Sequence, residues 1–144
     1  MLAAPCLADI HSVPIPESEE ILIHPQNPLK AILEECEEMF KVYLESPLGD
    51  GEKKTYIREL LDLGWKREAE IQLESGYQCC INTELNSTNL LINGEGKSNY
   101  LIDWEKPLFG NPAQDLGHFL APTTTFWKTD VILTSEEMEK FIDA

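Results

Sequence analysis

Apolar residues follow a helical rhythm through the first half of the chain. The segment Leu2–Ile10 is almost wholly apolar and predicts a helix that ends before the prolines that follow it. Asn27 followed by Pro28 is a typical helix start, because the asparagine side chain caps free N–H groups and proline fits the first helical position. A second amphipathic stretch over residues 56–65 predicts another helix, which Gly64 would break or kink.

The second half of the chain changes to short apolar bursts separated by polar loops, a pattern typical of strands. The predicted strands are Gln78–Ile81, Leu90–Ile92 and Tyr100–Ile102. Asn93–Gly94 begins a turn, so the last two strands are expected to pair as a hairpin. Helical patterns return over Gln114–Leu120 and, behind the N-cap candidate Ser135, over Glu136–Ile142.

These elements predict an α+β fold that is mostly α, with helices around a small β-hairpin. The length of 144 residues fits one domain that can bury a hydrophobic core. Hydrophobic residues at 42% and charged residues at 26% are ordinary for a folded, soluble protein. No apolar run reaches the length of a membrane span, and the N-terminal residues lack the positive charge of a secretory signal. We therefore expect a cytoplasmic protein.

The charge balance is strongly acidic. Lys and Arg number 11 and Asp and Glu number 26, which gives a formal net charge of -15. Such a surface repels nucleic-acid phosphates and anionic lipids, so we expect no nucleic-acid or membrane partner, whereas a cationic small molecule is compatible. Acidity that serves only solubility explains the composition at least as well. The 4 cysteines show neither a CxxC pair nor a histidine at zinc-ligand spacing, so reduced thiols are expected.

A carboxylate, an amide and a second carboxylate flank the predicted hairpin. Glu84 lies in the loop before it, Asn89 enters its first strand, and Asp103 leaves its second strand. Because the two ends of a hairpin meet, the side chains of Asn89 and Asp103 are expected at the same open end. Phosphoryl transfer requires an acidic residue that accepts a hydroxyl proton and oxygen ligands that hold magnesium on the phosphates. The alternative is that the three residues serve only turn chemistry.

Several segments in order resemble motifs of aminoglycoside phosphotransferases and choline kinase-like proteins. The stretch NTELNSTN, residues 82–89, is similar to the catalytic loop HGDxxxxN, and LIDWE, residues 101–105, resembles the metal motif IDWE. GNPAQDLG, residues 110–117, is similar to GxPxxDLA, and LADIHSVP, residues 7–14, resembles the LAxxHxxP segment that opens the C-terminal lobe. The resemblance covers nearly the whole chain and implies the C-terminal lobe of a protein kinase-like fold.

The resemblance implies a role for five residues. Asn89 and Asp103 would be magnesium ligands of an ATP-dependent kinase that phosphorylates a small-molecule hydroxyl, and Glu84 stands where the family has its catalytic aspartate. The extra methylene of Glu84 displaces the carboxylate by about 1 Å unless the loop adjusts, and a misplacement of that size can cost about a hundredfold in rate. Asn82 replaces a histidine that braces the loop, and Asp115 would support the loop through hydrogen bonds to its backbone.

Two parts of such a kinase are not recognisable in the sequence. The glycine-rich loop over the phosphates and the strand lysine of the N-terminal lobe have no counterpart, and the last predicted helix reaches the end of the sequence. The resemblance therefore predicts a single partial domain over residues 1–144, with the N-terminal ATP-binding lobe absent and the C-terminal helices truncated. Mg²⁺ and ATP would be cofactors of the intact two-lobed protein.

Two interpretations besides an active phosphotransferase stay open. A catalytically silent kinase-like module that binds a ligand or a partner protein is favoured by the departures at Asn82 and Glu84 and by the missing lobe. An unproductive gene remnant is the third. His11, His24 and His118 have no partners at ligand spacing, so we expect surface histidines or satisfied core histidines. Neither the identity of the substrate nor the oligomeric state follows from the sequence.

Overall fold

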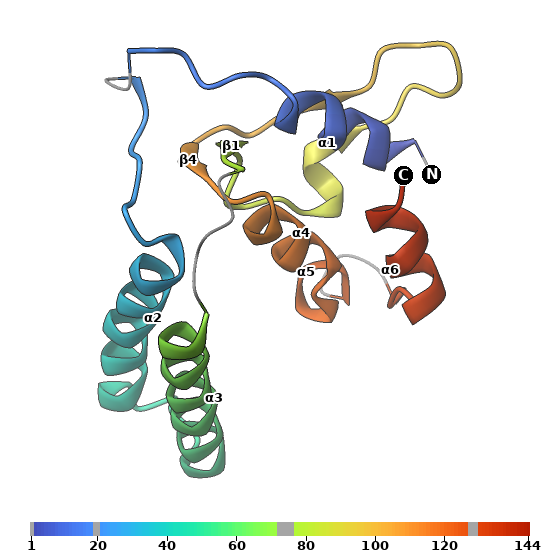
Figure 1. The fold of residues 1–144 in the computed structure, drawn as a ribbon. Coiled ribbons are helices and arrows are strands. Elements are labelled where there is room, and N and C mark those ends of the chain that lie inside the picture. Colours follow the sequence, from blue (N-terminus) through green and yellow to red (C-terminus); the bar gives the residue numbers. More distant parts are fainter. Residues whose placement is uncertain (1, 19–20, 72–76, 127–129) are drawn as a thin grey trace. The chain divides into compact units, whose positions relative to one another are not determined.

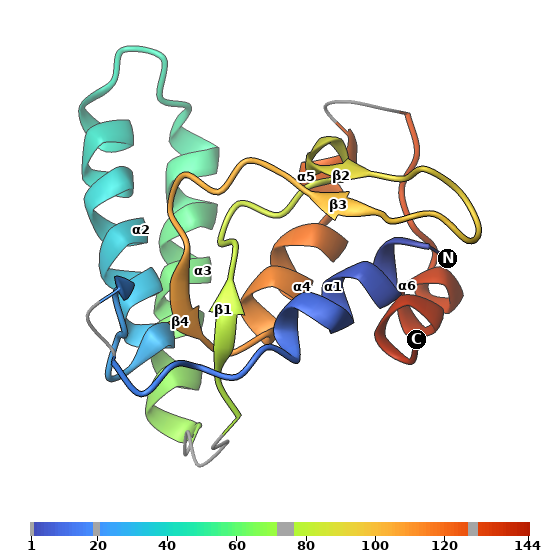
Figure 2. The ribbon, with the colours of Figure 1, turned by 90° about the horizontal axis from the view of Figure 1, so that it is seen from above.

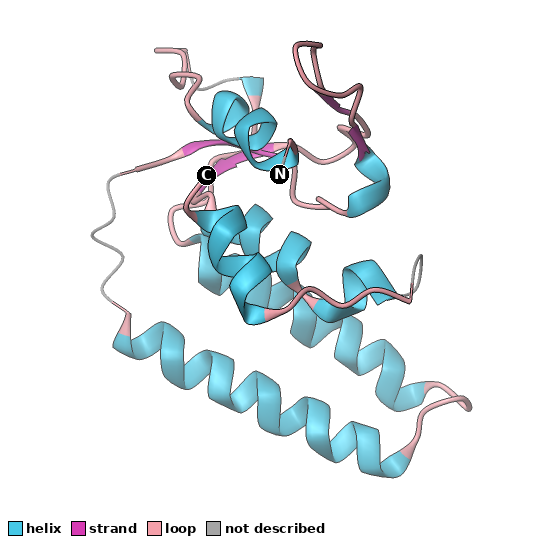
Figure 3. Cartoon of the chain, turned by 90° about the vertical axis from the view of Figure 1, so that its right-hand side faces the viewer, coloured by secondary structure: helices cyan, strands magenta, loops and turns pink. Residues whose placement is uncertain are grey.

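The chain forms an α+β structure that is mostly helical. The computed structural model describes residues 2–18, 21–71, 77–126 and 130–144 (Figure 1). The elements, in chain order, are α1 (Ala3–His11), α2 (Pro28–Glu45), α3 (Gly51–Glu70), β1 (Cys79–Ile81), a 3₁₀ turn (Ser87–Asn89), β2 (Leu90–Leu91), β3 (Tyr100–Leu101), β4 (Leu108–Gly110), α4 (Ala113–Leu120), α5 (Pro122–Phe126) and α6 (Ser135–Ile142). Figure 3 shows the predominance of helices, which confirms the fold class at this level.

The chain divides into two compact units, which are described separately. The first comprises residues 1–24 and 77–144, and the second comprises residues 25–76. The second unit is a hairpin of α2 and α3, whose helices lie side by side (Figure 1). The Asn27 side chain accepts a hydrogen bond of 3.0 Å from the backbone N–H of Lys30, so the predicted helix start is confirmed. The core of the hairpin is formed by Leu33, Phe40 and Leu61.

The expected break at Gly64 is wrong, because α3 continues through Gly64 to Glu70. A Cβ atom at this position would lie 2.6 Å from Cδ2 of Leu33, which is closer than atoms of packed side chains approach. Glycine therefore lets the buried leucine of α2 lie against the backbone of α3. The residue meets a packing requirement within a continuous helix rather than ending the helix.

The first unit contains two small antiparallel sheets. Strands β2 and β3 form the predicted hairpin, with Leu90 opposite Leu101. Strand β1 pairs with β4, with Cys80 opposite Phe109. The sequence did not predict β4, because Leu108 and Phe109 are its only large apolar residues and neither an alternating pattern nor a longer run marks it.

Helices α1, α4 and α6 contribute the core of the first unit together with the hairpin (Figure 2). Its buried members are Ala4, Leu7, Leu85, Leu101, Phe119 and Phe141. The rings of Phe119 and Phe141 stack with their centroids 4.6 Å apart, which joins α4 to α6. The N-cap of α6 is Thr134, one residue before the predicted Ser135, because Thr134 and Glu137 exchange the reciprocal hydrogen bonds of a capping box.

A membrane-crossing helix is not among the described elements, since none of them combines the necessary length with sufficient apolar character.

Candidate active site

Asp115 anchors the loop that carries the predicted active-site residues. The residue lies in α4 and is fully buried. Its Oδ2 accepts a hydrogen bond of 2.9 Å from the backbone N–H of Asn82, and its Oδ1 accepts one of 2.8 Å from the backbone N–H of Thr83. A carboxylate with two backbone donors is a strong, directional brace. These are the bonds that a loop-supporting role for Asp115 requires.

His11 is a third partner of the Asp115 carboxylate. Its Nε2 lies 3.0 Å from Oδ2 of Asp115, and both side chains are buried. His11 is thus a satisfied core histidine, as expected, and it ties the end of α1 to α4 behind the loop. The negative charge of Asp115 also acts on its surroundings: burial raises the pKa of the Cys79 thiol to about 11, and the Asp115 carboxylate adds to the rise.

Asn82 connects the loop to the segment that contains Asp103. Its Nδ2 donates a hydrogen bond of 2.9 Å to the backbone carbonyl of Asp103, and its Oδ1 accepts one of 3.3 Å from the backbone N–H of Glu84. Only 1% of the residue is exposed, so these bonds are shielded from water. One side chain therefore fixes the backbone at the predicted base and at one predicted metal ligand.

Asn89 is oriented by two contacts from the same region. Its Nδ2 donates a hydrogen bond of 3.3 Å to the carbonyl of Glu84, and its backbone carbonyl accepts one of 2.8 Å from the N–H of Ile102. The second bond sets Asn89 opposite the residue that precedes Asp103. With Nδ2 engaged, the side-chain oxygen has one contact among the described residues, a bond of 3.4 Å from the Thr88 hydroxyl. The residue is 5% exposed, and a contact of this length leaves Oδ1 with unused capacity to accept a bond.

Asp103 combines an exposed carboxylate with a left-handed backbone. Its φ angle is 67°, and Thr83 in the loop has a φ angle of 70°, so the non-glycine residues with positive φ in the described chain belong to this site. Such conformations cost about 1–3 kcal/mol each and concentrate at functional sites. The Asp103 carboxylate has no hydrogen-bond partner among the described residues, whereas its carbonyl is held by Asn82.

Glu84 is paired with a lysine that the sequence did not single out. Its Oε1 lies 3.3 Å from Nζ of Lys106, and the two side chains are 46% and 68% exposed. The backbone carbonyl of Lys106 also accepts a hydrogen bond of 3.0 Å from the Thr83 hydroxyl, so this segment lies against the loop. An ion pair that exposed contributes little to stability, and the ammonium group can be displaced.

The donor atoms at Asn89 and Asp103 suit a magnesium ion. Mg²⁺ prefers hard oxygen ligands and is commonly held by one or two protein groups, while water and phosphate oxygens complete its shell. A set of three or more His, Cys, Asp or Glu side chains that would hold a metal by themselves does not occur among the described residues. The oxygen donors that this end of the hairpin offers are thus the Asn89 amide oxygen and the Asp103 carboxylate.

The sequence reasoning missed two side-chain partners of the predicted residues, His11 for Asp115 and Lys106 for Glu84. His11 stood within the LAxxHxxP segment, and that motif was the available signal. The contact of Lys106 depends on the path of the segment between Asp103 and β4, and no spacing in the sequence indicates it.

Comparison of the chain with protein-family models, with curated proteins and with solved structures gives no match.

Proposed function

We propose that this chain carries the catalytic loop and the metal ligands of an ATP-dependent phosphotransferase that acts on a hydroxyl group of a small molecule. The observation that supports it most is a run of hydrogen bonds around Asn82. They join the backbone of Glu84 and Asp103 through the Asn82 side chain, and they join Asn89 to Glu84. Turn chemistry alone does not require residues that are 21 positions apart to be linked in this way.

Each residue has a defined task in the proposed reaction. The Glu84 carboxylate accepts the proton of the substrate hydroxyl, and the side-chain oxygens of Asn89 and Asp103 hold the cation. A bound Mg²⁺ neutralises charge on the phosphate oxygens. Asn82 and Asp115 contact no reacting atom and act as positioning residues. These roles are the ones that the motif resemblance described above implies.

A second candidate, a catalytically silent kinase-like module, is favoured by the Glu84–Lys106 pair. A general base needs a carboxylate that is free to approach the hydroxyl, and here the carboxylate lies 3.3 Å from an ammonium group. In this hypothesis the loop binds a nucleotide or another ligand and catalyses no reaction.

Nucleotide binding tests what the two hypotheses share. The ¹⁵N-labelled chain is titrated with ADP and Mg²⁺, and weak, saturable shifts are expected at residues 82–89 and 101–105. Asp103→Asn should abolish these shifts, because it removes the ligand charge while it keeps the shape of the side chain. Asp143→Asn, at the exposed end of α6, is the matched control and should leave them unchanged. Equal shifts in both variants would remove Asp103 from its assigned role.

Turnover separates the active enzyme from the silent module. ADP release from ATP is measured with a panel of small hydroxyl compounds, including amino sugars and amino alcohols. In the phosphotransferase hypothesis Glu84→Gln abolishes release, and Lys106→Met keeps or raises it because the carboxylate is freed. If the wild-type chain and Lys106→Met both bind nucleotide and neither releases ADP, the result would favour the silent module.

A further inference from the structure

Two side chains of α4 hold the candidate active-site loop, and the roles assigned above include only one of them. Asp115 accepts hydrogen bonds from the backbone N–H groups of residues 82 and 83, at the start of the loop. His118 follows one helical turn later on the same face of α4, and its Nδ1 donates a hydrogen bond of 2.7 Å to the backbone carbonyl of Leu85. The two contacts with α4 therefore lie on either side of Glu84 in the chain.

The bond to the carbonyl fixes where the histidine ring carries its hydrogen. A backbone carbonyl only accepts hydrogen bonds, so the hydrogen lies on Nδ1, and Nε2 of the neutral ring keeps its lone pair. Leu85 is 0% exposed, and within the described chain His118 is the hydrogen-bond partner of its carbonyl. Loss of the ring would leave a buried carbonyl unpaired, so the backbone beside Glu84 would have to move to restore a partner.

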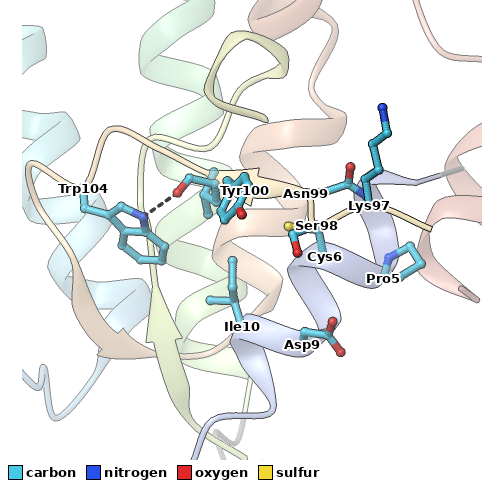
Figure 4. A pocket seen from close by; sticks show the side chains of 10 residues that line it. Pro5, Cys6, Asp9, Ile10, Lys97, Ser98, Asn99, Tyr100 and Trp104 are labelled. Carbon is cyan, nitrogen blue, oxygen red and sulfur yellow. Dashed lines mark hydrogen bonds between the residues drawn. The ribbon is translucent and has the colours of Figure 1, made fainter. Parts of the chain in front are cut away.

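The Asp103 side of the candidate site is held by a bond of the same kind. The indole Nε1 of Trp104 donates a hydrogen bond of 2.9 Å to the carbonyl of Leu101, and these two residues stand on either side of Asp103 in the chain (Figure 4). In both cases a ring N–H fixes a carbonyl close to a proposed active-site carboxylate. Because the second bond lies within residues 101–104, this segment serves as an internal reference for changes made at His118.

We propose that His118 is a positioning residue of the candidate active site, which sets the direction of the Glu84 carboxylate through the Leu85 carbonyl. The inference rests on the function proposed above, in which Glu84 accepts the substrate proton, and His118 contacts no reacting atom. With the backbone anchored before and after it, Glu84 presents its side chain in one direction. Release of the second anchor lets the side chain turn, and a displacement of about 1 Å at the reacting atoms can cost about a hundredfold in rate.

The ring nitrogens test the hydrogen bond without any substitution. Long-range ¹H–¹⁵N spectra of the wild-type chain should show the hydrogen of the neutral His118 ring on Nδ1. Hydrogen on Nε2 instead would overturn the proposal, because Nδ1 could not then donate to the Leu85 carbonyl.

Two amide variants measure the effect of the bond on Glu84. Asparagine carries its NH₂ group at the same distance along the side chain as Nδ1, so His118→Asn can still donate to the Leu85 carbonyl, whereas His118→Gln places the group one bond further out. The ¹⁵N order parameter of the Glu84 amide should stay at about 0.85 in the wild type and in His118→Asn and fall toward about 0.6 in His118→Gln. The amides of residues 101–104 should stay rigid in all three forms.

Gly117→Ala is the matched control, because it changes the neighbouring position of α4, where a Cβ atom would meet nothing within 4 Å. It should leave the order parameter of Glu84 unchanged. Equal order parameters for Glu84 in His118→Asn and His118→Gln would overturn the proposal, and so would an equal loss of order in Gly117→Ala and His118→Gln.

ADP release adds a measurement that a bond serving only the fold would not change. His118→Gln should lower kcat by about tenfold to a hundredfold and leave the KM for ATP unchanged, and His118→Asn should restore most of kcat. A rise in KM equal to the loss in kcat, or no rescue by asparagine, would show that His118 only supports the fold and would overturn the proposal. If the wild-type chain releases no ADP with any compound, the proposed phosphotransferase function fails, and the ring spectra and order parameters still decide whether His118 positions Glu84.

Discussion

Replacement of Asp115 by asparagine tests whether one buried carboxylate holds the candidate active-site loop. The carboxylate accepts from the backbone N–H groups of Asn82 and Thr83, one on each oxygen, and His11 lies on the Asn82 side. An asparagine has one oxygen and one NH₂ group. Whichever way the amide faces, its NH₂ group meets one of the two backbone N–H groups. A backbone N–H can only donate, so that pair forms no hydrogen bond.

The expected cost follows from these contacts. One buried donor is left unpaired at about 1–3 kcal/mol, and the two remaining bonds lose their charge assistance at about 1 kcal/mol each. We therefore expect Asp115→Asn to lower the free energy of unfolding of the first unit by about 3–5 kcal/mol. The exposed control Asp143→Asn should change it by less than about 0.5 kcal/mol.

Urea denaturation measures the loss of stability, and hydrogen exchange measures the loss of the two backbone hydrogen bonds. Denaturation followed by circular dichroism gives the free energy of unfolding, and exchange reports the amides of Asn82 and Thr83 directly. Both amides should lose protection in Asp115→Asn before the core of the first unit does. A loss of stability below about 1 kcal/mol, with both amides still protected, would refute the reasoning, because the bonds would then contribute no more than exposed ones.

Three further predictions concern other contacts. Hydrogen bonds from Arg58 hold the pKa of Glu37 at about 2 against an ordinary value of 4.5, so the stability that this group gives is present above pH 4.5 and is lost as the pH falls toward 2. Glu37→Gln should therefore lower the urea midpoint at pH 7 and not at pH 2, and a difference independent of pH would contradict this. Thr134→Ala removes the capping box with Glu137 and should cost about 1 kcal/mol in thermal unfolding, where no change would argue against the cap. Asp103→Gly relieves a φ angle of 67° and should raise stability by up to about 1 kcal/mol while it abolishes cation binding, and a clear loss of stability would show that the conformation is not strained.

Local signals in the sequence predicted the elements that depend on few residues. The cap at Asn27 and the turn after Asn93 act within a few positions of the chain, so the start of α2 and the β2–β3 hairpin were predicted correctly. Strand β4 was missed because its extended conformation depends on its pairing with β1, which the pattern of its own residues does not indicate. Gly64 was misjudged for a similar reason, since its role depends on a leucine of another helix.

The candidate site was predictable only in its parts. The types and spacing of Glu84, Asn89 and Asp103 indicated oxygen chemistry at the ends of a hairpin. The bonds that connect them run between side chains and distant backbone groups, as in the contact of Asn82 with the carbonyl of Asp103. The pairing of Glu84 with Lys106 depends likewise on the folded path of the chain. Such contacts follow from tertiary structure and leave no periodic trace in a single sequence.

The central proposal is that Asn89 and Asp103 share one divalent cation. Paramagnetic broadening by Mn²⁺ measures this directly, because signals near the bound ion disappear at low Mn²⁺ concentration. We expect early loss of the amide signals of residues 88–90 and 102–104, displacement of Mn²⁺ by excess Mg²⁺, and no such loss in either Asn89→Ala or Asp103→Asn. Broadening that spreads over the acidic surface, or that persists unchanged in both variants, would contradict a shared ion at the end of the hairpin.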